Sequence, residues 1–355
     1  MCHPLRPQRM FLLELASVFS LSTMVACSSG GSPADPVATG GTFGSGGSGG
    51  SSGSGAGASS AGGGGLPSAD AVVGTFSVTL NPALDEFTPA YTTVFGTVYS
   101  AEYPTDIVET PISSEGGCTT YQFSRHSCFE PLCTGAQKCA APNDCRETPN
   151  LVSVGTVSLT GLGAAPLTLS AINNNYQYAG DIVYPGVDDG GTVTLSATGG
   201  HYPAFTVTTT GVAPATLLAS SYLLSSGQPL VVEWEKGANT EAEVSVLLNI
   251  SKHGGSAGYL KCDTTDTGSL TIPVEPIQRL IALGVAGYPQ LTFARRARGE
   301  AAVTAGKIAL DAVALAIPAL AVEGYCSCFD SSDCGSCEDT TKTACDSVRK
   351  LCHAP

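Results

Sequence analysis

From Val72 onward, apolar residues alternate with threonine, serine or charged residues in short runs that turn residues separate. A period of two is typical of a strand that buries one face. We therefore predict strands over 74–80, 91–99, 152–160, 191–197, 204–210, 229–235, 242–250, 257–262, 269–272 and 290–294. Because helices are not interleaved, the pattern favours an antiparallel β-sandwich, immunoglobulin-like or jelly-roll. About 250 residues suffice for one large sandwich or for two packed ones.

Two segments depart from this alternation. A short helix is predicted over 275–283, where Pro276 lies near its start and Gly284 ends it. Segment 301–322 is ambiguous, because its alanines suit a helix whereas 307–313 alternates like a strand.

The first 26 residues have the order of an export signal. Arg6 and Arg9 give a positive start and 10–25 is an apolar segment. About 16 residues fall short of the ~20 that a membrane crossing needs. Glu14 weakens the run further, since a carboxylate in hydrocarbon is costly.

The stretch Met24-Val25-Ala26-Cys27 resembles a bacterial lipobox, although Met24 stands where leucine is usual. The resemblance implies cleavage before Cys27 and lipidation of Cys27. Serine at position 28 resembles the sorting signal that sends lipoproteins of diderm bacteria to the outer membrane. Two alternatives stay open: an ordinary secretion signal with Cys27 incidental, or a wrongly assigned start.

Composition separates a tether from a folded head. Residues 28–65 are almost wholly glycine, serine, alanine and threonine, and such a stretch cannot bury enough apolar surface to offset its chain entropy. We therefore predict a signal peptide over 1–26, a disordered tether over 27–69, a sandwich over 70–322 with a cysteine-rich insertion at 115–149, and a cysteine-rich module over 323–355.

The chain is acidic, with a formal net charge of −14 at pH 7. Removal of the predicted signal, which holds two arginines and one glutamate, leaves −15. This charge repels phosphate backbones, so nucleic acid is not expected as a partner. Nothing in the sequence indicates a cofactor.

Fourteen cysteines are present, and twelve remain once Cys2 and Cys27 are set aside. An even number in an exported protein favours disulfides. Six form a C-terminal group: Cys326, Cys328, Cys334, Cys337, Cys345 and Cys352. Five lie in the insertion, Cys118, Cys128, Cys133, Cys139 and Cys145, and Cys262 stands apart. Five cysteines cannot all pair with one another, so one of them needs a partner outside the insertion. We therefore predict a disulfide from Cys262 that clamps the insertion to the sandwich; the other pairings stay open.

Zinc is the alternative for the C-terminal group, where Cys326-Ser-Cys328 and Cys334-Gly-Ser-Cys337 have zinc-like spacings and His353 follows Cys352. Thiolates would have to escape oxidation outside the cytoplasm. We therefore predict no metal site.

Two strings match catalytic motifs. Asp266-Thr-Gly-Ser269 is the aspartic-protease string, but that chemistry needs two carboxylates and this string occurs once. His253-Gly-Gly-Ser256-Ala-Gly258 contains the hydrolase GxSxG, yet it lies between two predicted strands rather than between a strand and a helix. We interpret both as turns.

Other candidates rest on single residues. Trp234 is a candidate ligand contact, as a platform on which a sugar stacks; the alternative is a core residue, which a lone strand tryptophan more often is. Asp188 and Asp189 could bind calcium, although a solvated turn is favoured. The basic cluster at 295–298 is interpreted as an exposed strand end rather than an anion site.

The whole chain resembles the cysteine-rich, tethered surface lipoproteins encoded by myxobacterial genomes. The resemblance rests on the lipobox, the tether, the strand around Trp234, the run from Cys262 to Pro273 and the terminal cysteine group. The strand around Trp234 is also similar to those of fibronectin type III-like sandwiches, although the insertion departs from them. These resemblances imply location and fold and carry no assigned activity.

We therefore expect a non-enzymatic protein held at the outer membrane by a lipid on Cys27, which binds polysaccharide or another envelope protein. A surface hydrolase, carbohydrate-active or esterase-like, and a spacer without a ligand are the alternatives.

Overall fold

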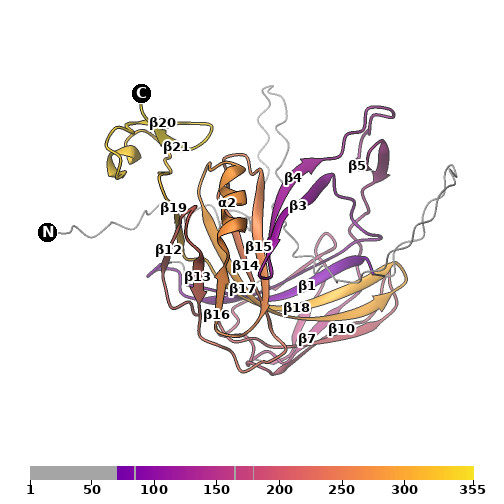
Figure 1. Cartoon of the computed structure of the whole chain (residues 1–355). Coiled ribbons are helices and arrows are strands. Elements are labelled where there is room, and N and C mark those ends of the chain that lie inside the picture. The colour runs from indigo at the N-terminus through magenta and orange to yellow at the C-terminus, as the bar shows by residue number, and fades with distance from the viewer. Residues whose placement is uncertain (1–69, 84, 164, 179) are drawn as a thin grey trace, which may run out of the picture. The chain divides into compact units, whose positions relative to one another are not determined.

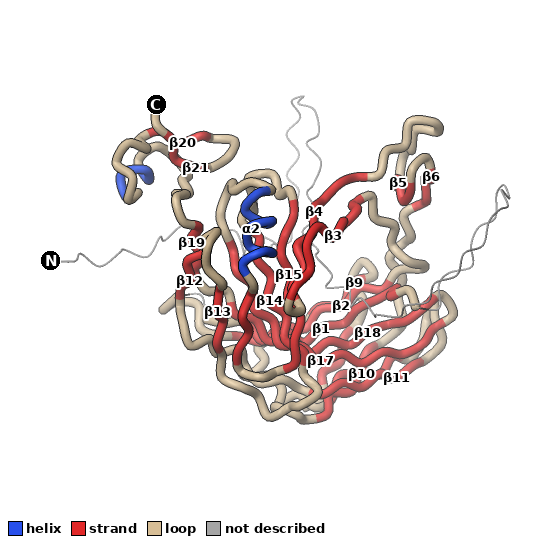
Figure 2. Tube along the Cα trace, viewed as in Figure 1, coloured by secondary structure: helices blue, strands red, loops and turns tan. Residues whose placement is uncertain are grey.

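The computed structural model describes residues 70–83, 85–163, 165–178 and 180–355, all of which fall within one unit, Leu66–Pro355. The predicted signal, Cys27 and the tether lie outside the described residues. The described chain is a β-sandwich, built from strands with a single α-helix among the described elements (Figure 2). None of the described helices has the length and apolar character that a membrane crossing requires.

The main sheet has eleven strands. Its central path runs β3 (Ile107–Glu115), β4 (Cys118–Arg125), β15 (Gly258–Thr265), β14 (Glu243–Asn249), β17 (Gln290–Val303), β18 (Gly306–Ala316), β1 (Val72–Asn81), β2 (Tyr91–Val98) and β9 (Asn175–Gln177). Beside this path, β19 (Ala319–Val322) pairs with β17 and with β12 (Ser221–Leu224). Because β1 runs parallel to β18 and β12 runs parallel to β19, the sheet is mixed rather than wholly antiparallel (Figure 1).

Smaller elements complete the fold. One four-stranded sheet has the order β11 (Phe205–Thr210), β10 (Thr192–Ala197), β7 (Val157–Thr160) and β8 (Leu167–Leu169). Three strand pairs are β13 (Leu230–Glu233) with β16 (Ser269–Ile272), β5 (Gln137–Ala141) with β6 (Asp144–Glu147), and β20 (Ala344–Asp346) with β21 (Leu351–His353). The helices are α2 (Val274–Ala282) and the short 3₁₀ helix η1 (Asp333–Ser336).

Two hydrophobic cores share one face of the main sheet. The first core lies between β1, β2 and β18 and the four-stranded sheet. The second core lies between β14, β15 and the start of β17 on one side and β13, β16 and α2 on the other. Both cores use odd-numbered residues of β17: Ala297 belongs to the first core, and Leu291 and Phe293 belong to the second. Since alternate residues of a strand share a face, this is the packed face of the sheet.

Helix α2 matches the predicted helix to within one residue at each end. Pro273 precedes it and Gly284 follows it at a φ of +107°. Its buried residues Ile277 and Leu280 belong to the second core, and the helix lies against β3, β4 and β15 (Figure 2). Its position is further fixed by Thr120, whose hydroxyl donates to the carbonyl of Pro276 at 2.8 Å.

All twelve cysteines of the described chain form disulfides. The pairs are Cys118–Cys262, Cys128–Cys139, Cys133–Cys145, Cys326–Cys337, Cys328–Cys345 and Cys334–Cys352. The bridge from Cys262 reaches Cys118, which lies directly opposite it on β4. Because both cores and all six disulfides lie within Leu66–Pro355, this head has what it needs to fold on its own.

The structure settles the local organisation of two segments. The predicted insertion at 115–149 contributes β4 to the main sheet, and only the segment after Arg125, with the β5–β6 hairpin, lies outside that sheet. The ambiguous segment 301–322 forms strands, because β18 lies between β17 and β1 and its alanines are buried there.

Candidate functional site

The residues singled out by motif are structural. Trp234 is 3% exposed, its ring lies 5.1 Å from that of Phe293, and its indole Nε1 donates to the carboxylate of Asp266 at 2.6 Å. An indole enclosed in this way offers no face to a ligand. The prediction of a ligand contact at Trp234 is therefore wrong, and the residue belongs to the second core.

Asp266, from the aspartic-protease string, is 5% exposed and forms an ion pair with Arg295. Nε of Arg295 lies 2.8 Å from Oδ2 of Asp266, although Nε itself makes no hydrogen bond. The backbone N–H of Gly237 also donates to Oδ2, at 2.9 Å. A carboxylate held by a guanidinium, an indole and a backbone amide is a structural anchor rather than a proton carrier.

The basic cluster at 295–298 is not the exposed strand end that the sequence predicted. Arg295 is fully buried between the two cores and donates to the carbonyls of Ala213 and Pro214 at 3.0 and 2.8 Å. Arg298 forms a two-bond pair with Asp311, both bonds at 2.7 Å. The prediction failed because the strand was ended at residue 294, whereas β17 continues to Val303.

Ser256 of the GxSxG string and Asp189 of the aspartate pair also have structural partners. Ser256 follows the turn after β14, and its hydroxyl bonds to Asn249, Ser251 and the carbonyl of Gly258 rather than to His253. The carboxylate of Asp189 accepts from the backbone N–H groups of residues 238 and 239, at 2.5 and 3.2 Å. Among the described residues Ser256 thus has no bond to a histidine, and both carboxylate oxygens of Asp189 accept from the backbone.

The sulfur atoms that lie close enough together to hold a metal come from two sets of cysteines, one in the insertion and one at the C-terminus. Every member of both sets is in a disulfide. Because a thiolate is the ligand that zinc requires, the oxidised sulfurs do not fit a zinc centre.

The other face of the main sheet, which we call the outer face, carries a group of aromatic and amide side chains that no sequence motif indicated. Tyr121 on β4 lies opposite Tyr259 on β15 and opposite Pro111 on β3. Asn249 on β14 lies opposite Gln290 on β17. Leu248 pairs with Leu260, so the next step of this register brings Asn249 level with Tyr259. These five residues cross the sheet in the order Pro111, Tyr121, Tyr259, Asn249, Gln290, which we call the aromatic–amide row.

One half of the row is an aromatic surface. The rings of Tyr121 and Tyr259 are stacked, with centroids 5.1 Å apart and an interplanar angle of 26°. Phe123 lies two residues from Tyr121 on the same strand, and its centroid is 5.4 Å from that of Tyr259. The hydroxyl of Tyr259 donates to the carboxylate of Glu109 at 2.8 Å. All three rings are half-buried, so they are fixed in place yet reach solvent.

The other half of the row carries amides. Oδ1 of Asn249 accepts from the backbone N–H of Ser251 at 3.0 Å, and Oε1 of Gln290 accepts from Nζ of Lys252 at 2.6 Å. Both side-chain oxygens are thus occupied, whereas neither amide nitrogen has a hydrogen-bond partner among the described residues. Neither nitrogen is among the buried polar atoms that lack a partner, so both reach solvent as donors.

The electrostatics of the row are balanced. Burial raises the pKa of Tyr259, and the hydrogen bond to Glu109 raises it further, so the phenol stays neutral and donates. Burial lowers the pKa of Lys252. Lys261, beside Tyr259 on the same face, is paired with Asp263 at 2.8 Å. Each half of the row is thus bordered by one charged residue, Glu109 beside the rings and Lys252 beside the amides, and the two charges have opposite sign.

The sequence contained a signal for this site. On β4 the aromatic residues Tyr121 and Phe123 alternate with buried Cys118 and Thr120, so they lie on the other face of the strand. On β15, Tyr259 likewise lies on the face opposite to Cys262. Aromatic residues at these positions indicate a cross-strand cluster on the face away from the core, which can stabilise the sheet and also offer rings to a ligand.

Neither a scan against protein-family models nor a search of the curated proteins finds a match for this chain.

Proposed function

We propose that this protein is a non-enzymatic, lipid-anchored envelope protein that binds an uncharged polysaccharide on the aromatic–amide row. The observation that carries the proposal is the stacked pair Tyr121–Tyr259 in one line with two amides whose nitrogens are free to donate. Aromatic rings cover the apolar face of a sugar ring, and amide donors bond to its hydroxyls. A few placed polar groups beside an apolar surface are what such recognition needs.

The charged residues beside the row favour an uncharged ligand. A strongly anionic glycan would meet Glu109 beside the rings, and a cationic one would meet Lys252 beside the amides. The rest of the head is acidic and repels anionic polymers at longer range. We therefore propose a neutral glycan, held at the cell surface through the tether that the sequence predicts.

The site also suits binding better than hydrolysis. Glycoside hydrolysis needs two carboxylic groups facing each other across the scissile bond. The carboxylates near the row are engaged, Glu109 by Tyr259 and Asp263 by Lys261. Ser256, which an esterase would need as nucleophile, bonds to Asn249 rather than to a base.

The test is affinity electrophoresis of the head, Leu66–Pro355, through gels that contain neutral glucans, mannans or xylans, with peptidoglycan sacculi and an outer-membrane protein extract assayed by pull-down. We expect retardation by at least one neutral glycan. Tyr259→Ala is expected to weaken the affinity about tenfold or more, as loss of a central aromatic contact does. Tyr259→Phe keeps the ring and is expected to retain most of the affinity.

The control is Tyr103→Ala, which removes a tyrosine that is 46% exposed but lies outside the row. Equal loss in Tyr103→Ala and Tyr259→Ala would contradict the proposed site. Binding to the protein extract alone would favour recognition of an envelope protein, and no binding to any fraction would favour a spacer.

A further inference from the structure

The aromatic–amide row continues beyond Gln290. On the outer face Gln290 of β17 lies opposite Ala319 of β19, and Ala319 lies opposite Ser221 of β12. Paired residues of neighbouring strands share a face of the sheet, so Ala319 and Ser221 extend the row. Burial agrees with this assignment, because the next residue on each strand, Leu320 and Tyr222, packs with the second core on the other face.

The extended row, which we call the track, crosses the main sheet from one edge to another. It runs through β3, β4, β15, β14, β17, β19 and β12 in the order Pro111, Tyr121, Tyr259, Asn249, Gln290, Ala319, Ser221. Among the described residues, β3 pairs with β4 alone and β12 pairs with β19 alone. Seven strands have six spacings of about 4.8 Å, so the track is about 29 Å long.

Both ends of the track are open. Pro111 is exposed on the edge strand β3, and Ala319 and Ser221 are exposed at the other end. Their side chains are too small to form a wall across the track. A chain molecule that lies on the track can therefore continue past both edges of the sheet.

Apolar side chains border the track near both ends. Phe123 lies two residues beyond Tyr121 on β4, and Leu223 lies two residues beyond Ser221 on β12. Four antiparallel pairings and one parallel pairing connect β4 to β12, so these two strands run in the same direction. Phe123 and Leu223 thus lie on the same side of the track, and Leu223, which is 58% exposed, is open to a ligand.

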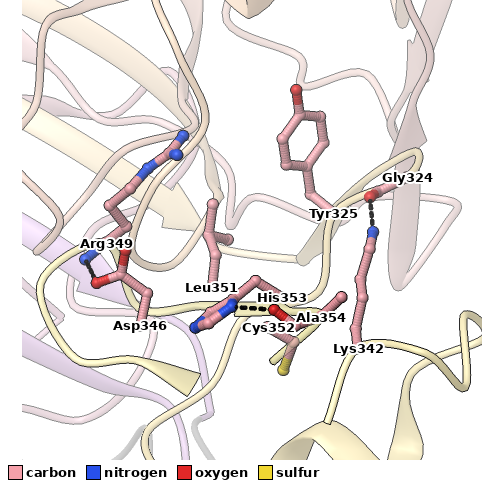
Figure 3. A pocket seen from close by; sticks show the side chains of 9 residues that line it. All are labelled: Gly324, Tyr325, Lys342, Asp346, Arg349, Leu351, Cys352, His353 and Ala354. Carbon is pink, nitrogen blue, oxygen red and sulfur yellow. Dashed lines mark hydrogen bonds between the residues drawn. The ribbon is translucent and has the colours of Figure 1, made fainter. Parts of the chain in front are cut away.

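The residues of the track are half-buried or exposed, so they contact a ligand from one side only. A depression of about 430 Å³ in the C-terminal module is lined by residues between 324 and 354, none of which belongs to the track (Figure 3). Its polar groups have partners of their own: Lys342 donates to the carbonyl of Gly324 at 2.6 Å, and Asp346 accepts from the backbone N–H of Arg349 at 3.0 Å. A pocket buries most of a small ligand, whereas the track does not.

The twist of the sheet turns the track along its length. Neighbouring strands are rotated by about 20–25° on average, so over six spacings the side chains turn about the axis of the track through roughly 120° or more. The flat face of a crystalline polymer cannot contact both ends of such a track. A single solvated chain can, because its glycosidic bonds rotate.

We propose that the track binds an internal segment, about six sugar units long, of a single linear glycan chain and does not recognise chain ends. This inference rests on the proposed function and adds the length and physical state of the ligand. One unit of an extended pyranose chain advances about as far as one strand spacing, which sets the number of units. Because contact from one side gives little affinity per unit, several units must bind together to offset the entropy cost of association.

The experiment is isothermal titration calorimetry of the head, Leu66–Pro355, with oligosaccharides of about two to eight units cut from the glucan, mannan or xylan that retards it. We expect the affinity to rise about tenfold or more from three units to six and to level off beyond six. Reduction of the chain end to the alditol is expected to leave the affinity of the eight-unit chain unchanged. In pull-downs with cellulose or mannan, the swollen amorphous form is expected to retain more of the head than the crystalline form.

A variant at the far end of the track tests its length. Leu223→Ser is expected to weaken binding of the six-unit chain about fivefold and to leave the three-unit chain unaffected, because a short chain binds at the aromatic end. The matched control is Leu218→Ser. Leu218 is 64% exposed, but its backbone N–H donates to the carbonyl of Glu233 on β13, which lies on the packed side of the main sheet. This variant is expected to leave the binding of both chains unchanged.

Three results would each overturn this inference: equal affinities for three and six units, loss of binding when the chain end is reduced, or equal effects of Leu223→Ser and Leu218→Ser. Preferential binding to the crystalline polymer would overturn it too. In each of these cases, retardation by the polymer that depends on Tyr259 would still support the proposed function. Failure of every neutral polymer to retard the head would overturn both.

Discussion

Two neighbouring arginines on β17 lie on opposite faces of the main sheet and have different environments. The side chain of Arg295, on the packed face, is 0% exposed and lies 2.8 Å from the 2% exposed carboxylate of Asp266. The side chain of Arg296, on the outer face, is 13% exposed and lies 3.5 Å from Glu243, which is 69% exposed. The same residue type thus forms a buried ion pair between the two cores on the packed face. On the outer face it forms a longer ion pair with an exposed carboxylate.

We propose that the two faces of the main sheet have different tasks where β4, β15 and β14 lie. The packed face holds both cores and the disulfide from Cys118 to Cys262, so changes there act on stability. The outer face at β4, β15 and β14 holds the aromatic–amide row, so changes there are expected to act on binding. Pairs of adjacent residues, one on each face, test this division directly.

The largest effect is expected from Arg295→Met. Removing one partner of a buried ion pair leaves Asp266 charged and buried, which costs about 3–5 kcal/mol of the free energy of unfolding. Urea denaturation of the head measures this cost. The outer-face counterpart, Glu243→Gln, removes the exposed carboxylate of a longer ion pair and is expected to cost about 0–1 kcal/mol.

A double variant sharpens this prediction. Arg295→Met with Asp266→Leu removes both charges, and replacing a buried ion pair by apolar side chains is often close to neutral. We expect the double variant to recover much of the stability that Arg295→Met loses. A double variant that is less stable than Arg295→Met would show that the ion pair is needed for more than mutual neutralisation.

The disulfide that ties β4 to β15 is expected to have the next largest effect. Cys118 and Cys262 are 144 residues apart, and loss of a bridge that closes a long loop costs about 2–5 kcal/mol. Cys118→Ser with Cys262→Ser is therefore expected to lower the urea midpoint of the whole head. Cys128→Ser with Cys139→Ser opens a bridge of separation 11 outside both cores and is expected to lower it less.

The elements that the sequence predicted correctly are those with local signals. The helix at 274–282 is bounded by Pro273 and Gly284, and strands such as β1 and β14 alternate apolar and polar residues over most of their length. The β3 strand was missed because Pro111 and a serine–glutamate run hide its pattern. The parallel pairing of β1 with β18 could not be predicted, because it joins segments more than 200 residues apart.

The site was harder to predict than the fold, because its residues are distant in sequence and carry no motif. Tyr121 and Asn249 come from strands on either side of β15, and only the register of the sheet brings them into one row. Arg295 was misread for a similar reason: its partner Asp266 is 29 residues away, and nothing local to Arg295 indicates a buried charge.

A smaller effect is expected from a pair of threonines on β4. Thr120 is fully buried on the packed face and donates to the carbonyl of Pro276 in α2, whereas Thr119 lies on the outer face beside Ser114. Thr120→Val removes a buried hydrogen bond and is expected to cost about 1 kcal/mol. Thr119→Val is expected to change the free energy of unfolding by less than about 0.5 kcal/mol. Equal costs would contradict the division between the faces.

The smallest effect concerns the ionisation of Tyr259. Its pKa is raised above the ordinary value of 10 by burial first and then by the hydrogen bond and the charge of Glu109. Because the pKa is higher in the folded state than in the unfolded state, the protonated phenol stabilises the folded protein. This stabilisation is complete below pH 10 and is lost as the pH rises through the pKa that Tyr259 has in the folded state. In an alkaline absorbance titration we expect Tyr259→Phe to remove one late-ionising phenol. Glu109→Gln is expected to lower the pKa of Tyr259 only in part, because burial remains the larger cause; a full return to 10 would show that Glu109, rather than burial, controls this ring.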